Sequence, residues 1–340
     1  MQLALRQPSA EVASRLPPYD ALFFVSFGGP ERREDVIPFL ENVLRGKPVP
    51  RERLLEVAEH YYHFDGKSPI NDQNLELIAA LRADFEANGL KLPIYWGNRN
   101  WQPMIASTLK QMHADGVRRA AVFVTSAYGS YSGCRQYRED IGRALDATGI
   151  TDMVLEKLPH FCLSAEYIQV MTERVQAAYT QFSEGAALAF TAHSIPVSMA
   201  ESSPYVQQLD QSCKIVATAA GHEEWALVYQ SRSGAPSQPW LEPDILDHLR
   251  RLHADGAKDV VVCPIGFCSD HMEVLYDLDT EAAALCQELG MRMARASTAG
   301  SHPLFVEMIR KQVLAGVTTP ILGRCSGDCC PTPQRPTSRT

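Results

Sequence analysis

The sequence predicts an α/β fold of two similar doubly wound halves that face each other across a central cleft. Short apolar runs alternate with amphipathic segments, as in parallel sheets with right-handed helical crossovers. A helix end, a glycine stop and a buried strand also recur: Leu109–Gly116 and Leu249–Gly256 both end in His-Ala-Asp-Gly and lead into apolar runs. The repeat indicates a duplicated domain, with a boundary near Phe161–Ala165.

Apolar runs bounded by turn residues predict eight strands. These strands are Ala21–Phe27, Pro93–Gly97, Ala120–Thr125, Met153–Leu158, Ala187–Thr191, Trp225–Tyr229, Val260–Phe267 and Arg292–Ala296. Helical periodicity covers Glu52–Phe64, Asn74–Asn88, Met104–Ala114, Gln136–Ala147, Tyr167–Tyr179, Tyr205–Ala220 and His302–Leu314. The predicted organisation is an extension over 1–20, a first half over 21–163, a second half over 164–322 and a cysteine-rich tail over 323–340.

Composition and charge exclude some classes of function. The 340 residues carry 32 Lys+Arg and 40 Asp+Glu, a net charge of -8, which argues against nucleic acid as the main partner. No apolar run approaches the roughly 18 residues of a membrane span. The first twenty residues lack the apolar core of a secretory signal. We therefore expect a soluble, cytoplasmic monomer.

The stretch Cys263–Glu281 is where the chemistry is expected. It starts as a buried strand, turns and enters a helix that Asp270 can cap. Glu273, Asp277 and Glu281 follow at i, i+4 and i+8, so they share one helix face. This stripe is either a solvated acidic face or a path for cations or protons. Because Glu273 follows a strand end, where open α/β sheets build their sites, we favour the path.

Other predicted strand ends carry side chains that suit a ligand. A lone histidine is more often structural, but His193 ends a strand and can pair with Glu273, which favours catalysis. Arg232 follows another strand and can bind a carboxylate, while Trp240 packs either on a flat ligand or in the core. The loop 125–133 offers hydroxyl groups and tyrosine rings, or is simply a polar loop. Without a G-x-G-x-x-G or P-loop motif, nucleotide binding has little support.

The cysteines need a separate account. An odd number, nine, without a secretory signal argues against a disulfide framework. Cys325, Cys329 and Cys330 lie close together near the C-terminus, which suggests thiolate ligation of zinc or of an iron–sulfur cluster. A redox-sensitive tail without a metal is the alternative.

Five motifs occur in the order found in ferrochelatases, and the sequence resembles that family over roughly residues 20–320. They are Ser26-Phe27-Gly28-Gly29-Pro30, Gly66-Lys67-Ser68-Pro69-Ile70, Ala192-His193-Ser194-Ile195-Pro196, Gln230-Ser231 and Asp270-His271-Met272-Glu273-Val274-Leu275-Tyr276-Asp277. The resemblance implies two Rossmann-like, chelatase-type domains and insertion of Fe²⁺, as substrate, into a porphyrin bound between them.

The resemblance also implies roles for the site residues. His193 matches the histidine proposed to accept pyrrole protons or to bind the incoming metal, and Glu273 matches its partner carboxylate. Asp277 and Glu281 match the acidic path behind them. The residue types suit the reaction, because neutral imidazole can take a proton or ligate Fe²⁺ and carboxylates can relay protons outward. Phe27 stands where some bacterial members have tyrosine, so we assign it packing against the macrocycle.

The segment Asn42–Arg51 bears on the substrate. It is short and basic, unlike the apolar lip of membrane-associated members, which use protoporphyrin IX. It resembles the soluble actinobacterial type, which makes coproheme from coproporphyrin III with its four propionates. The residues expected to contact the substrate are Phe27, Arg45, Ser68, Arg99, Tyr131, Gln230, Arg232 and Trp240.

A subset of ferrochelatases holds a [2Fe-2S] cluster through one mid-chain and three C-terminal cysteines. By that resemblance the ligands are Cys162, Cys325, Cys329 and Cys330, with Cys263 or Cys268 as possible substitutes. Several alternatives stay open: a protoporphyrin IX ferrochelatase, a cobalt or nickel tetrapyrrole chelatase, and a non-catalytic haem or redox sensor. Transient contact with neighbouring enzymes of the haem pathway is also expected.

Overall fold

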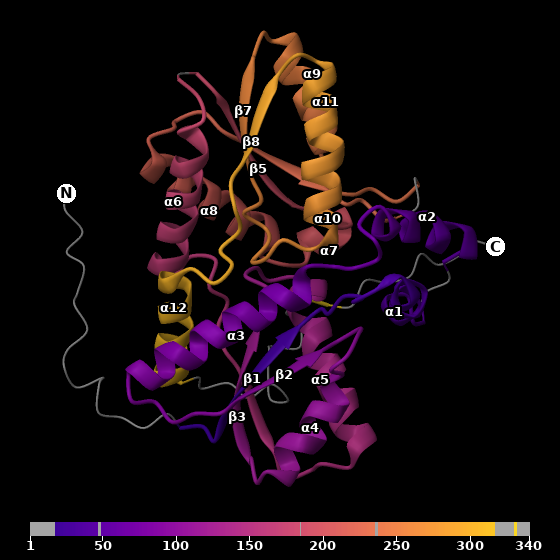
Figure 1. The fold of residues 1–340 in the computed structure, drawn as a ribbon, viewed down its shortest axis with the longest axis vertical. Coiled ribbons are helices and arrows are strands. Elements are labelled where there is room, and N and C mark those ends of the chain that lie inside the picture. The colour runs from indigo at the N-terminus through magenta and orange to yellow at the C-terminus, as the bar shows by residue number, and fades with distance from the viewer. Residues whose placement is uncertain (1–17, 47–48, 184, 235–236, 317–329, 332–340) are drawn as a thin grey trace.

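The computed structural model describes residues 18–46, 49–183, 185–234, 237–316 and 330–331. Its two four-stranded sheets lie at opposite ends of the long axis, with helices packed around each (Figure 1). All strand pairs in both sheets are parallel. Within the described residues, no helix combines the length and the hydropathy needed to cross a bilayer.

The first sheet has the strand order β2-β1-β3-β4. Its strands are β1 (Ala21–Ser26), β2 (Ile94–Asn98), β3 (Arg119–Val124) and β4 (Val154–Lys157). The helical segments of this half are η2 (Arg33–Asp35), α1 (Val36–Val43), α2 (Arg51–Tyr62), α3 (Ile70–Ala87), α4 (Ile105–Ala114), η3 (Tyr131–Arg135) and α5 (Gln136–Thr148). Because β1 is wholly buried, its apolar side chains pack on both faces, as expected for a central parallel strand.

The second sheet has the order β6-β5-β7-β8, so it repeats the first with each strand replaced by its counterpart. Its strands are β5 (Ala187–His193), β6 (Ala226–Gln230), β7 (Asp259–Cys263) and β8 (Arg292–Arg295). The helical segments are α6 (Ala165–Tyr179), α7 (Val197–Glu201), α8 (Tyr205–Ala220), α9 (Ile245–Ala254), α10 (Met272–Val274), η4 (Leu275–Ala282), α11 (Ala283–Glu288) and α12 (Pro303–Ala315). The predicted α/β fold with two similar halves is therefore confirmed.

The C-terminal helix α12 joins the two halves. It packs against α6 and also against α3 of the first half. Arg310 Nε lies 2.7 Å from Asp84 Oδ2 on α3, and Lys311 Nζ lies 2.7 Å from Glu166 Oε1 on α6. The ring of Phe305 meets Phe161 at 5.3 Å between centroids, within one apolar core that is shared by both halves. These contacts fix the position of α3 relative to α6.

The turn after β7 differs from the prediction in two ways. The strand ends at Cys263 and not at Phe267, because Pro264 has no N–H to continue the ladder. Asp270 does not cap the following helix: the cap is His271, whose Nδ1 accepts from Glu273 N–H at 3.2 Å. Asp270 instead pairs with Arg295, 3.0 Å away on β8.

Candidate active site

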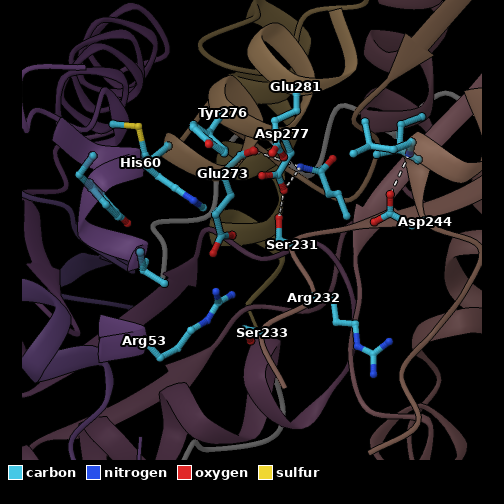
Figure 2. A pocket seen from close by; sticks show the side chains of 16 residues that line it. Arg53, His60, Ser231, Arg232, Ser233, Asp244, Glu273, Tyr276, Asp277 and Glu281 are labelled. Atoms are coloured by element: carbon cyan, nitrogen blue, oxygen red, sulfur yellow. Dashed lines mark hydrogen bonds between the residues drawn. The ribbon is translucent and has the colours of Figure 1, made fainter. Parts of the chain in front are cut away.

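A cavity of about 300 Å³ lies between the halves, next to the carboxyl ends of β5 and β6 (Figure 2). Helix α2 forms one wall, and α10 with η4 forms the facing wall. The lining residues are Arg53, Val57, His60, Tyr61, Gln230, Ser231, Arg232, Ser233, Asp244, Ile245, Leu246, Met272, Glu273, Tyr276, Asp277 and Glu281. One wall therefore carries carboxylates, and the opposite rim carries arginine and hydroxyl groups.

His193 is the last residue of β5, and backbone contacts fix its position. Tyr205 Oη donates to the His193 carbonyl at 3.0 Å, and Ser194 N–H donates to the Gln230 carbonyl at 2.8 Å. The turn after β7 packs directly on this strand end, because a Cβ at Gly266 would lie only 2.7 Å from the Cα of Ala192. Glycine at this position lets the next segment of chain bring Glu273 close to His193.

His193 and Glu273 form the central pair of the site. His193 Nε2 lies 3.6 Å from Glu273 Oε2, while Nδ1 bonds to the Ser194 carbonyl. Burial opposes the imidazolium charge, but the Glu273 carboxylate and the Ser194 carbonyl outweigh it and raise the pKa of His193. Desolvation likewise opposes the Glu273 charge, but the His193, His271 and His60 imidazoles hold the pKa of Glu273 well below its usual range. The pair thus favours one proton held on the imidazole.

Asp277 is the second member of the acidic wall. It accepts hydrogen bonds from Ser231 Oγ and, at 3.3 Å, from Gln230 Nε2. Burial, and then the charges of Glu273 and Glu281, outweigh these bonds and raise the pKa of Asp277 to about 7. Glu281 follows, and burial and the nearby Asp244 raise its pKa as well. The Asp277 carboxyl can therefore take up and release a proton near neutral pH.

Two of the three residues of the acidic wall lie on a π-helix, while Glu273 lies on the short α-helix α10 that precedes it. The i→i+5 pattern of η4 runs over Leu275–Ala282 and holds Asp277 and Glu281. π-Helical turns are rare and cluster at functional sites. The expected stripe nevertheless survives: Glu273, Asp277 and Glu281 all line the same cavity, so the interpretation of a solvated outer face is the weaker one.

The structure brings together only some of the predicted site residues. Gln230, Arg232, Glu273, Asp277 and Glu281 line the cavity, and His193 contacts it through Glu273. The other candidate substrate contacts are outside its lining: Phe27, Arg45, Ser68, Arg99, Tyr131 and Trp240.

Those other candidates have partners within the protein. Arg99 is only 6% exposed and pairs with Asp140, below the ring of Phe27 at 5.6 Å. Tyr131 Oη donates to Glu139 Oε2 at 3.1 Å. Arg45 donates to Asn42 on the surface of the first half. Ser68 is buried against Gly29, and Gly234 packs on the indole of Trp240. Any substrate contact by Arg99 requires it to share its charge with Asp140.

The sequence analysis did not assign eleven of the sixteen lining residues to the site, and four of these bear on its charge or its packing. His60 and Arg53 come from α2, Tyr276 from η4, and Asp244 from the N-terminus of α9. The signal for the α2 pair was present, because Arg53 and His60 share a helix face at i and i+7. Nothing in that pattern shows which face of α2 meets the second half.

The cysteine candidates divide into two groups. Cys162 and Cys330 are buried, while Cys325 and Cys329 lie outside the described residues. Cys162 sits in the apolar core shared by the halves, and burial raises the pKa of its thiol to about 11. Among the described residues, no group of three or more His, Cys, Asp or Glu side chains is placed to hold a metal ion.

Comparison with known proteins decides the family. The ferrochelatase family model matches residues 19–316. The chain belongs to the ferrochelatase family. Membership makes it a ferrochelatase, a lyase of haem biosynthesis whose metal substrate is Fe²⁺.

Relatives of similar length support the assignment. A ferrochelatase of Rhodopirellula baltica is 54% identical over 339 residues, covering 95% of this chain and 97% of the relative. A coproporphyrin III ferrochelatase of Streptomyces coelicolor is 48% identical over 351 residues, covering 92% and 94%. Among solved structures, SirB from Bacillus subtilis with Fe³⁺ aligns with a TM-score of 0.52 at 14% identity, covering 86% of this chain and 95% of SirB. The last likeness concerns the fold of the ferrochelatase and not its substrate.

Proposed function

We propose that this ferrochelatase inserts Fe²⁺ into coproporphyrin III to give coproheme. The observation that carries the proposal is the polarity of the cavity. Its acidic wall, Glu273 to Glu281, suits a dication and outgoing protons, while Arg53 and Arg232 at the opposite rim suit carboxylates. A tetrapyrrole with four propionates matches this arrangement better than protoporphyrin IX, which has fewer. Relatives named coproporphyrin III ferrochelatase at about 48% identity add support.

In this proposal His193 and Glu273 act at the pyrrole nitrogens. With Nδ1 bonded to the Ser194 carbonyl, His193 presents Nε2 toward Glu273 and the reacting atoms. Metal insertion releases two pyrrole protons. His193 accepts each pyrrole proton after its imidazole has released the proton that it held, and Asp277 and Glu281 pass the released protons outward, because the pKa of Asp277 lies near neutral pH. The same carboxylates replace water around the arriving Fe²⁺.

The propionates are assigned to the two sides of the cleft. Arg53 and Arg232 flank the cavity, and Figure 2 shows the Arg53 side chain extending toward Glu273 while Arg232 points away. On the first half, the remaining candidates for contact with a propionate are Arg45, Ser68, Tyr131 and Arg99. Phe27 offers a ring near Phe39, at 6.2 Å between centroids, on which the macrocycle can pack.

An anaerobic metallation assay tests the proposal. We expect Fe²⁺ insertion with coproporphyrin III to have a kcat/KM at least tenfold above that with protoporphyrin IX, and Fe²⁺ to be preferred to Co²⁺ and Ni²⁺. A higher kcat/KM with protoporphyrin IX would overturn the substrate assignment. Preferred insertion of Co²⁺ or Ni²⁺ would indicate a different metal substrate. Haem binding without turnover of any porphyrin would identify the sensor alternative.

We also propose that Cys162, Cys325, Cys329 and Cys330 hold a [2Fe-2S] cluster. The buried position of Cys162 suits a sulfur ligand that is shielded from water, and the high pKa of its thiol shows that a metal would have to stabilise the thiolate. Such a cluster would tie the C-terminal tail to the junction of the halves. Its redox chemistry is not part of metal insertion.

The test is spectroscopic. We expect reddish-brown protein with a reduced-state EPR signal of a [2Fe-2S] centre, which Cys325→Ser abolishes and Cys286→Ser does not. Cys286 is a matched control because it is a buried cysteine of the second half that is not among the proposed ligands. Colourless protein after anaerobic reconstitution, or zinc as the only metal, would contradict the cluster and leave the metallation proposal intact.

A further inference from the structure

We propose that His60 is a positioning residue for metal insertion: its ring stacks on Tyr276 across the gap between the halves and holds η4 so that Glu273 and Asp277 face the cavity. The inference depends on the ferrochelatase reaction, and it does not depend on which porphyrin is the substrate. His60 comes from the first half and Tyr276 from the second, so one aromatic contact joins the two walls of the site (Figure 2).

The geometry of the contact is that of an aromatic stack. The two ring centroids are 3.8 Å apart and the ring planes differ by 8°. His63, three residues further along, meets the same Tyr276 ring edge-on at 6.3 Å and 86°. Two histidines of one chain segment thus contact a single ring from two directions. Stacked aromatic pairs contribute stability beyond that of their buried area, so this contact can hold η4 against α2.

Helix η4 depends on such contacts. A π-helical turn has poorer intrinsic stability than an α-helical one, so its conformation requires tertiary support. On the second half, Ser231 and Gln230 hold Asp277 by hydrogen bonds. On the first half, His60 and His63 hold the adjacent residue, Tyr276. Neighbouring residues of η4 are therefore fixed from opposite sides of the cleft.

The contact also lies beside the reacting groups. His60, Glu273, Tyr276 and Asp277 all line the same cavity. Burial lowers the pKa of His60, Arg53 lowers it further, and Glu273 opposes them in part. Loss of the stack releases the wall that carries both carboxylates.

The experiment compares His60→Ala with His60→Phe. The alanine variant loses the stack, and we expect kcat for Fe²⁺ insertion to fall about tenfold while the porphyrin Kd and the thermal midpoint stay close to wild type. Phenylalanine keeps a flat ring without nitrogens, so we expect it to restore kcat to within about twofold. His253→Ala, at an exposed position on α9, is the matched control and should leave kcat unchanged.

A double-mutant cycle with Tyr276→Leu separates positioning from other roles. If the two rings act as one unit, kcat of His60→Ala/Tyr276→Leu should match that of either single variant. Three results would overturn the inference: unchanged kcat in His60→Ala, equal losses in His60→Phe and His60→Ala, or multiplicative losses in the double variant. A lowered thermal midpoint with unchanged kcat would show a purely structural contact and overturn it too.

Discussion

The two halves share one topology but treat their acidic residues differently. In each half a π-helical segment follows the third strand: η3 after β3 and η4 after β7. Behind η3, Glu139 pairs with Arg135 at 3.0 Å and accepts from Tyr131. In η4, Asp277 accepts hydrogen bonds from the neutral groups of Ser231 and Gln230. The carboxylate behind η3 is thus paired with an arginine, while burial and neighbouring carboxylates raise the pKa of Asp277 in η4 to about 7.

This difference shows how two halves with the same topology can differ in the chemistry of their acidic residues. The Glu139 carboxylate is held by the Arg135 guanidinium and by the Tyr131 hydroxyl, so both of its oxygens are engaged in structural contacts. Glu273 has histidine partners, and Asp277 has a hydroxyl partner. The pKa values of these two acids therefore depend on burial and on the charge that each exerts on the other. The catalytic assignment to the second half therefore rests on the partners of the acids and not on the acids alone.

The largest effect is expected at His193. His193→Ala removes the imidazole from the central pair, and we predict that kcat for metal insertion falls by about 10²–10⁴, the usual range for a general acid–base group. Porphyrin affinity, measured by fluorescence quenching, should change little because His193 binds protons and not propionates. Wild-type turnover in a folded His193→Ala protein would remove His193 from the mechanism.

A comparison between the halves gives the next effect. Glu273→Gln removes the charge that pairs with His193, and we predict a loss of about a hundredfold in kcat. Glu139→Gln is the matched change in the first half, and its kcat should stay within about twofold of wild type because Glu139 is engaged by Arg135. Anaerobic initial rates measure both variants. Similar losses in the two would show that the halves do not differ as described.

A pH-dependent effect of intermediate size is expected at Asp277. Folding raises the pKa of this carboxyl from 3.8 to about 7, so between these values the folded protein binds more protons than the unfolded chain. This group therefore makes the free energy of unfolding fall as pH rises through that window. Asp277→Asn abolishes the fall, so its stability relative to wild type should increase from about pH 4 to pH 7 and then level off.

Urea unfolding at several pH values measures this difference, with Asp279→Asn as a control in the same helix but outside the cavity. In kcat, we expect Asp277→Asn to cost about tenfold and to remove an apparent pKa near 7 from the pH–rate profile. A stability difference that is independent of pH would show that Asp277 is not protonated near neutrality.

The smallest effect is expected at the outer end of the acidic wall. Glu281→Gln removes a charge that lies beyond Asp277, and we predict a rise of about twofold in the KM for Fe²⁺ with kcat nearly unchanged. Glu288→Gln, on α11 and outside the cavity, should have no effect. If Glu281→Gln lowered kcat as much as Glu273→Gln, the contribution of the acidic wall to catalysis would not decrease from Glu273 to Glu281.

The sequence predicts the fold of the protein better than the detailed geometry of its site. All eight strands were predicted, because buried parallel strands are continuous apolar runs bounded by turn residues. His193 and Glu273 were predicted together from their strand ends and motifs, and the structure places them 3.6 Å apart. The π-helical conformation of η4 was not predicted. It differs from an α-helix in that each backbone N–H bonds to the carbonyl five residues back and not four, and the spacing of apolar residues does not reveal that difference.

Contacts between segments that are distant in the sequence could not be predicted either. The His60–Tyr276 stack joins positions far apart in the chain, and an amphipathic helix such as α2 does not reveal its distant neighbour. Arg99 was expected to face the substrate, and its burial against Asp140 depends on a helix from another part of the first half. His271 caps the helix in place of Asp270 because the Asp270 carboxylate is paired with Arg295. That pair too joins segments that are distant in the sequence.

The position of α12 in the sequence affects the order in which the two halves can fold and pack together during synthesis. Synthesis runs from the N-terminus, and domains generally fold as units while the chain emerges. Helix α12 spans Pro303–Ala315 in a chain of 340 residues, yet it packs on α3 of the first half. The first half therefore emerges with that face of α3 uncovered until α12 has been made. A nascent chain that has not yet reached α12 consequently lacks the contacts by which this helix ties α3 to α6.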